Sequence, residues 1–106
     1  MLSLLKSLFS SQPKVDLASV IHQGALLVDV RSPAEFASGH VKGSVNIPLS
    51  EVAKRVKEFK KRSPVIVFCQ SGNRSSQAIT ILKKNGITDV YNGGGWANVN
   101  RLVKNN

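Results

Sequence analysis

Apolar residues form short continuous runs that alternate with helically spaced stripes. ALLVDV at 25–30 and PVIVF at 64–68 have strand length and few polar positions, which is typical of buried strands of a parallel sheet. SVNIP at 44–48 is predicted as a short strand closed by its proline. TDVYNGGGW at 88–96 is predicted as a last strand that runs into a glycine-rich turn. The pattern therefore predicts four strands.

Helical segments separate these strands. DLASVIHQG is predicted as a helix with Asp16 as its cap and Gly24 as its stop, and SPAEFASG as a serine-capped helical turn with Pro33 first and Gly39 at its end. A closing helix is expected to reach about Lys104. Because strands and helices alternate, the predicted fold class is α/β with a parallel sheet.

Two further helices are predicted to be amphipathic. SEVAKRVKEFKKR at 50–62 carries cations on its solvated face, and its inner stripe is Val52, Ala53, Val56 and Phe59. SSQAITILKKNG at 75–86 ends at Gly86, and its inward residues are Ala78, Ile79 and Leu82.

The N-terminal segment, residues 1–14, is separated from a domain at 15–104 by the linker-like SSQPK. MLSLLKSLFSS has apolar residues at helical spacing, which favours a short amphipathic helix that docks on the domain. A frayed tail, a membrane-surface role and export are the alternatives. It is a poor match to a secretory signal because Lys6 interrupts the apolar stretch and no small-residue cleavage site follows.

Composition and charge narrow the function. The chain has 106 residues, 42% hydrophobic and 20% charged, which fits one globular domain. No apolar run approaches the roughly 20 residues of a membrane span. The net charge of +9 serves solubility or attracts small anions. Nucleic-acid binding is not expected, because the one aromatic residue among the cations of 54–62, Phe59, belongs to the inner stripe and leaves no aromatic residue for stacking.

The only cysteine, Cys69, follows the strand at 64–68 and precedes a helix predicted to begin near Ser75. Free N–H groups at a helix N-terminus, a loop that curls at Gly72 and the charge of Arg74 would all stabilise a thiolate. The alternative is an inert buried cysteine. Since the chain has one cysteine, it has no intrachain disulfide, and a group taken up by Cys69 must leave to another molecule. No cofactor or metal is expected.

Other conspicuous residues are interpreted as structural. Asp29 is expected to support the site through the loop amides or Arg74, and Arg31 to pair with Glu35 four residues on. His40 is interpreted as structural rather than as a general base, and Trp96 as packing. His22 lacks a metal-site pattern, and the glycines of 93–95 are expected to let the chain turn beneath the Cys69 loop.

Three motifs carry a resemblance to a known family. LLVDVRSPAEFASGHVKGSVNIP resembles the N-terminal signature of rhodanese-like domains, CQSGNRS their active-site loop, and VYNGGGW their glycine-rich segment. The resemblance runs from about residue 15 to 104, and the chain is similar to single-domain rhodaneses. It implies a five-stranded, mostly parallel sheet with helices on both faces.

The resemblance also implies sulfurtransferase chemistry. Cys69 would be the nucleophile that takes sulfur from thiosulfate or a persulfide donor, and cyanide or a thiol would be the acceptor. The donor is a small anion, so the loop would bind it through Gln70, Ser71, Gly72, Asn73, Arg74 and Ser75.

Other functions stay open. Phosphatases and arsenate reductases with a cysteine nucleophile resemble a pattern of five residues between cysteine and arginine, whereas four lie between Cys69 and Arg74. A non-catalytic binding module or a sulfur carrier is the main alternative, with the basic helix around Lys57 as a docking face for an acidic protein partner. A reactive lone thiol favours the cytoplasm, with export or the periplasm as the alternative.

Overall fold

A four-stranded, fully parallel sheet lies at the centre of the part of the chain that the computed structural model describes, residues 15–105. The predicted N-terminal helix or tail at 1–14 lies outside the described residues. The strand order is β2-β1-β3-β4. The strands are β1 (Leu26–Asp29), β2 (Val45–Asn46), β3 (Val65–Cys69) and β4 (Val90–Gly95).

The expected five-strand count is wrong for the described residues, although the α/β class is confirmed. All three strand pairs of this sheet run parallel. The chain's own apolar pattern gives four strands, and the fifth came only from the resemblance. Between residues 15 and 105 the segments outside these strands carry helical spacing or turn residues, so none offers a fifth apolar extended run.

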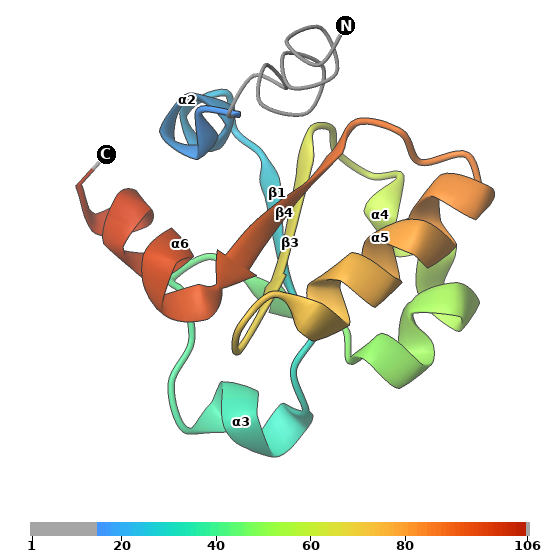
Figure 1. Ribbon diagram of the computed structural model, residues 1–106, viewed down its shortest axis with the longest axis horizontal. Helices are drawn as coiled ribbons and strands as arrows, with labels where there is room; N and C mark the ends of the chain where they lie inside the picture. The colour runs from blue at the N-terminus through green and yellow to red at the C-terminus, as the bar shows by residue number, and fades with distance from the viewer. Residues whose placement is uncertain (1–14, 106) are drawn as a thin grey trace, which may run out of the picture.

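Helices cover both faces of the sheet. In Figure 1, α2 and α6 lie on one side, α4 and α5 on the other, and α3 lies beyond the carboxyl ends of the strands. None of the helices within residues 15–105 is long and apolar enough to cross a membrane. Their bounds are α2 Leu17–His22, α3 Pro33–Ala37, the 3₁₀ helix η1 Leu49–Arg55, α4 Val56–Phe59, α5 Asn73–Lys84 and α6 Trp96–Lys104.

The alternation of side chains along β3 divides the core into two layers. Val65, Val67 and Cys69 face the cluster that Val52, Phe59, Ala78 and Leu82 close from the η1, α4 and α5 side. Ile66 and Phe68 face the opposite cluster with Val20, Leu27, Val41 and Val99. Because β3 is covered on both faces, all five of its residues are buried, as a central parallel strand requires.

Capping residues set the helix ends as predicted. Asp16 accepts a hydrogen bond from the Ser19 amide, and Ser32 and Glu35 form a reciprocal capping box around Pro33. Gly86 follows α5 with a positive φ of 85°, which favours glycine after a helix.

The segment 50–62 is not the single amphipathic helix that was predicted. It is a 3₁₀ helix followed by one α-helical turn. Val52 and Phe59 are buried as expected and Val56 is half-buried, but Ala53 is exposed. The predicted stripe assumed one continuous period of 3.6 residues, whereas the segment has three residues per turn up to Arg55 and becomes α-helical only at Val56.

Candidate active site

Cys69 lies at the carboxyl end of β3, between the neighbouring strands β1 and β4. Its side chain is buried, with 1% of its surface exposed. The Gly72 amide donates a hydrogen bond to the Cys69 Sγ at 2.9 Å, and the Ser75 Oγ lies 3.6 Å from the same sulfur. Residues three and six positions after the cysteine therefore curl back over it, as the loop was predicted to do.

Gly72 makes this curl possible. Its φ of 104° lies in the left-handed region that favours glycine, and it is the residue before the first turn of α5. The helix consequently begins at Asn73, two residues earlier than predicted. Its N-terminal amides therefore lie next to the Cys69 loop.

The glycine-rich end of β4 supports the loop from below. A Cβ atom on Gly95 would lie 2.8 Å from the Gln70 carbonyl oxygen, and one on Gly72 would lie 3.4 Å from the Gly94 Cα. Backbone therefore packs directly on backbone beneath the loop, but the predicted turn at 93–95 is wrong, because these glycines belong to β4 and pair with β3.

Asn92, which sequence reasoning missed, ties the loop to β4. Its Oδ1 lies 2.7 Å from the Ser75 Oγ and accepts from the Gly94 amide at 2.8 Å. Its Nδ2 donates to the Gly72 carbonyl oxygen at 3.2 Å and to the Ser76 Oγ at 2.9 Å. The only signal in the sequence is an asparagine directly before three glycines.

The surroundings of Cys69 favour its ionised form. Burial raises the pKa of the thiol, but the Ser75 hydroxyl and the backbone amides of Ser75, Ser71 and Gly72 lower it by more. The pKa of Cys69 therefore lies below its ordinary value. Hydrogen-bond donors of the loop are the main causes of this stabilisation.

The sequence suggested that the charge of Arg74 stabilises the thiolate, but in the structure Arg74 forms an ion pair with Glu35. Its Nη1 and Nη2 donate to the two carboxylate oxygens of Glu35 on α3, at 2.7 and 3.0 Å. The bond to Arg74, together with the Ser32 amide, lowers the pKa of Glu35 to about 2. The predicted pair between Arg31 and Glu35 is wrong, because α3 turns Glu35 toward α5.

Asp29 is completely buried and binds Arg31 rather than the loop amides or Arg74. The Arg31 backbone N–H and Nε donate to it at 2.9 and 3.0 Å, and Nη2 donates at 2.8 Å. Nη2 also donates to the Gly39 carbonyl oxygen, and the guanidinium lies 4.6 Å from the centre of the Trp96 ring. The expectation of direct bonds from Asp29 to the loop is therefore wrong. Any support that Asp29 gives to the site is therefore indirect, through the position of Arg31 at the carboxyl ends of the strands.

The remaining predicted residues lie at the rim or away from the site. Gln70, Ser71 and Asn73 are exposed in or next to the loop. His40 is exposed, stacks on Phe36 and lies 2.8 Å from its carbonyl oxygen through Nδ1, which fits a structural role.

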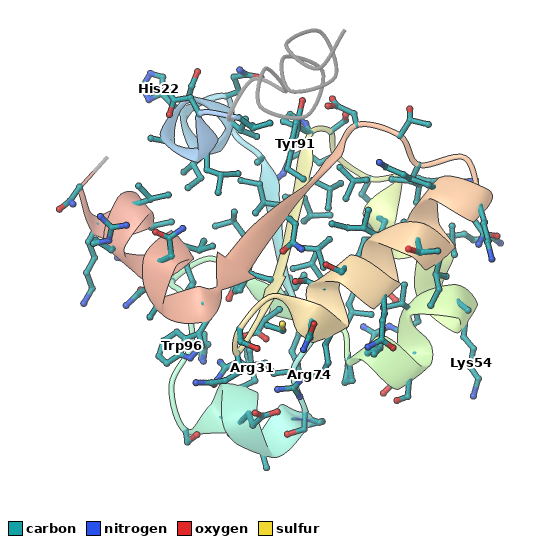
Figure 2. All side chains as sticks on the ribbon, viewed as in Figure 1. His22, Arg31, Lys54, Arg74, Tyr91 and Trp96 are labelled. Atoms are coloured by element: carbon teal, nitrogen blue, oxygen red, sulfur yellow. The ribbon has the colours of Figure 1, made fainter. Side chains whose placement is uncertain are left out.

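Figure 2 separates the two ends of the sheet. It shows His22 and Tyr91 at the end opposite Arg31, Arg74 and Trp96. Within residues 15–105, no three His, Cys, Asp or Glu side chains gather as a metal site would need. The assembled site is thus a low-pKa sulfur held by amides and a hydroxyl, a setting suited to nucleophilic attack and to holding an anionic sulfur afterwards.

Comparison with known proteins gives a consistent picture. The model of the rhodanese-like domain matches residues 14–101. An uncharacterized protein of Bacillus subtilis is 45% identical over 71 residues, which cover 67% of this chain and 56% of that protein, so the chain spans just over half of that relative. A thiosulfate sulfurtransferase of Pseudomonas syringae is 36% identical over 83 residues, 78% of each chain.

Two further matches bear on the site. A putative sulfur carrier protein of Bacillus subtilis is 39% identical over 66 residues, which cover 62% of this chain and 36% of that protein. A rhodanese from E. coli, solved with anions, superposes with a TM-score of 0.64 at 39% identity and covers 70% of this chain and 89% of its own.

Proposed function

The chain belongs to the rhodanese-like domain family, and we propose that it is a thiosulfate sulfurtransferase that works through a persulfide on Cys69. The observation that carries the proposal is the placement of the Cys69 sulfur, 2.9 Å from the Gly72 amide and next to the Ser75 hydroxyl. Because the lowered pKa of Cys69 raises the fraction of thiolate, the sulfur can attack without a general base.

In the first half-reaction, the Cys69 thiolate attacks the outer sulfur of thiosulfate. A sulfur–sulfur bond forms to Cys69, the bond between the two thiosulfate sulfurs breaks, and sulfite leaves with its electron pair. The amides of Ser71, Gly72 and Ser75 point toward the reacting sulfur and would hold the negative charge of the persulfide as they hold that of the thiolate.

In the second half-reaction, cyanide or a thiolate attacks the outer sulfur of the persulfide. The bond between that sulfur and the Cys69 sulfur breaks, and its electron pair restores the Cys69 thiolate. The sequence has no second cysteine that could resolve the persulfide, so the acceptor comes from another molecule.

The loop favours sulfur transfer over phosphate or arsenate chemistry. Four residues separate Cys69 from Arg74, and the Gly72 amide donates directly to the Cys69 sulfur at 2.9 Å, which indicates a loop tightened around one sulfur atom. The guanidinium of Arg74 binds the Glu35 carboxylate instead of facing an empty tetrahedral anion site.

The proposal is tested by thiocyanate formation from thiosulfate and cyanide. The parent protein should show double-displacement kinetics, and Cys69→Ser should form no thiocyanate while its circular dichroism stays unchanged, because serine is nearly isosteric but does not ionise near neutral pH. Persistent turnover in Cys69→Ser would exclude Cys69 as the nucleophile. If the parent protein is folded but transfers no sulfur, the sulfurtransferase proposal fails and the non-catalytic binding module becomes the favoured function.

A sulfur carrier is the second candidate, because one relative is a putative sulfur carrier and because η1 and α4 form a basic surface. On η1 and α4 both carboxylates, Glu51 and Glu58, bind Arg55. Neither carboxylate forms a salt bridge with the exposed lysines of this surface, which are Lys54, Lys57, Lys60 and Lys61. Such a surface complements an acidic protein.

Charge reversal at Lys57, Lys60 and Lys61 separates the two roles. A carrier should lose transfer from a protein persulfide donor, whereas its rate with thiosulfate should fall only by the smaller factor that the reduced net charge causes. Equal retention of both rates would contradict the carrier role.

A further inference from the structure

An ion pair closes one side of the Cys69 loop. Arg74, the second residue of α5, binds both carboxylate oxygens of Glu35, and about a third of each side chain is exposed. Glu35 has little freedom to leave, because its Oε1 also accepts from the Ser32 amide at 2.9 Å and its own amide donates to the Ser32 hydroxyl. The only charged side chain within the active-site loop sequence is thus bound to a fixed anion.

The second arginine at this end of the sheet is neutralised in the same way. Arg31 binds the buried Asp29, and Figure 2 shows Arg31 and Arg74 at the same end of the sheet, the end at which α3 lies. These two pairs sum to zero charge, although the whole chain carries +9. An arriving anion therefore meets arginines whose charges are already balanced.

We propose that Glu35 is a specificity-determining residue, which lowers the affinity of the site for multiply charged sulfur donors by neutralising Arg74. The inference rests on the proposed function, since it concerns the donors of that reaction. Glu35 touches no reacting atom in this account and acts only through its charge and its bond to Arg74. The ion pair therefore disfavours dianions such as thiosulfate relative to monoanionic or neutral sulfur compounds, without excluding dianions as donors.

The charge of the donor sets the size of the effect that we expect from removing the Glu35 charge. Electrostatic energy is proportional to the product of the charges, so one added positive charge at the site attracts a dianion twice as strongly as a monoanion. Thiosulfate is a dianion, and methanethiosulfonate is a monoanion that donates its outer sulfur and releases methanesulfinate. Removal of the Glu35 charge should therefore change the logarithm of kcat/KM about twice as much for thiosulfate.

Glu35→Gln is a suitable variant, because glutamine also closes a capping box and can keep α3 in place. Glu58→Gln is its matched control. Glu58 is exposed to a similar degree, 38% against 36%, and binds Arg55 through two hydrogen bonds on α4. Both variants remove one negative charge from the chain, but only Glu35→Gln removes it beside the Cys69 loop.

In Glu35→Gln we expect kcat/KM to rise about threefold to tenfold with thiosulfate and by about the square root of that factor with methanethiosulfonate. Both gains should shrink in 0.5 M salt. Glu58→Gln should change neither value appreciably. An equal change with both donors, or a loss with thiosulfate, would overturn the proposal, because it would make Glu35 a structural support of Arg74.

A second readout does not depend on sulfur transfer. Iodoacetate and iodoacetamide alkylate the same thiolate but differ by one negative charge. The rate with iodoacetate divided by the rate with iodoacetamide should rise in Glu35→Gln and stay at the parental value in Glu58→Gln. An unchanged ratio in Glu35→Gln would overturn the proposal. If the parent protein transfers no sulfur but this ratio rises, the proposed function fails while the role of Glu35 in selecting against anions stands.

Discussion

At the scale of single residues, the reactivity of Cys69 depends on donors that the loop brings to its sulfur. The Ser75 hydroxyl has one hydrogen and several acceptors, since Asn92 Oδ1 lies at 2.7 Å, the Gly72 carbonyl oxygen at 3.0 Å and the Cys69 Sγ at 3.6 Å. When the thiol ionises, the sulfur becomes the strongest of these acceptors. Asn92 then serves to hold the serine in reach rather than to act on the sulfur itself.

Substitution of Ser75 tests this account. Ser75→Ala should raise the pKa of Cys69, because the hydroxyl that lowers it is lost. At pH 7 the thiolate fraction falls, so iodoacetamide should alkylate Cys69 roughly threefold to tenfold more slowly, which lies within the typical net contribution of one hydrogen bond, about 0.5–1.5 kcal/mol. The pH dependence of the alkylation rate measures the shift.

Ser76→Ala is the control for this prediction. The Ser76 hydroxyl also donates to the Gly72 carbonyl oxygen and accepts from Asn92, but no hydrogen bond joins it to the sulfur. Its alkylation profile should match that of the parent protein. Equal shifts in both variants would mean that the loop conformation, and not the Ser75 hydroxyl, sets the pKa.

The sequence predicted some residues of the site and missed others for one physical reason. Cys69, Gly72 and Ser75 lie within seven positions, so their proximity follows from local backbone geometry. The partners of the loop come from afar, since Asn92 lies 17 residues after Ser75 and Glu35 lies 39 residues before Arg74. Local spacing instead suggested a pair between Arg31 and Glu35, which the turn of α3 prevents.

At the scale of elements, β4 positions the active-site loop through its lack of side chains. Gly93 is the extra residue at an irregularity in the pairing of β3 and β4, where Asn92 faces Val67 and Gly94 faces Phe68. A Cβ atom on Gly93 would lie within 3 Å of Val99 and Ile66 carbons. Glycine at positions 93 and 95 therefore allows β4 to lie close to the core and to the Cys69 loop.

Gly95→Ala should disturb the loop more than the fold. The Gly95 backbone has a φ of −80°, which alanine adopts without strain, so the cost is the contact with the Gln70 carbonyl oxygen at 2.8 Å. We expect a loss of about 1–3 kcal/mol in the free energy of unfolding. A loss of at least tenfold in kcat/KM for sulfur transfer should accompany it.

Gly39→Ala provides the comparison, because its Cβ would meet only the Trp96 ring at 3.4 Å, an ordinary contact. Its stability and activity should stay near those of the parent protein. Parental activity in Gly95→Ala would show that the loop does not depend on the close approach of β4.

The sequence predicted those helices and strands correctly whose position depends on a single local pattern, either an apolar run or a capping residue. The buried runs gave β1 and β3, and the capping residues gave the ends of α2 and α3. The segment 50–62 carried the spacing of an α-helix, yet most of it is 3₁₀, because packing of η1 against α5 outweighs the weak local preference.

At the scale of the whole molecule, charge is distributed unevenly between the site and the surface. The arginines beside the loop are paired, while lysines of η1 and α4 extend into solvent (Figure 2, Lys54). The net charge of +9 therefore attracts anions over a long range without strengthening their binding at the site itself.

Ionic strength should reveal this long-range attraction. Between 0.02 M and 0.5 M salt, kcat/KM for thiosulfate should fall several-fold, because screening shortens the reach of the field. The alkylation rate with uncharged iodoacetamide serves as the control and should stay nearly constant. A thiosulfate rate that is independent of salt would contradict attraction by the net charge.

The central claim is that Cys69 carries the transferred sulfur, and the intact mass of the protein after treatment with thiosulfate tests it most directly. We predict that the parent protein gains the mass of one sulfur atom, that cyanide removes this gain, and that Cys69→Ser shows none. A folded protein with a free Cys69 thiol and no gain in mass would contradict the claim.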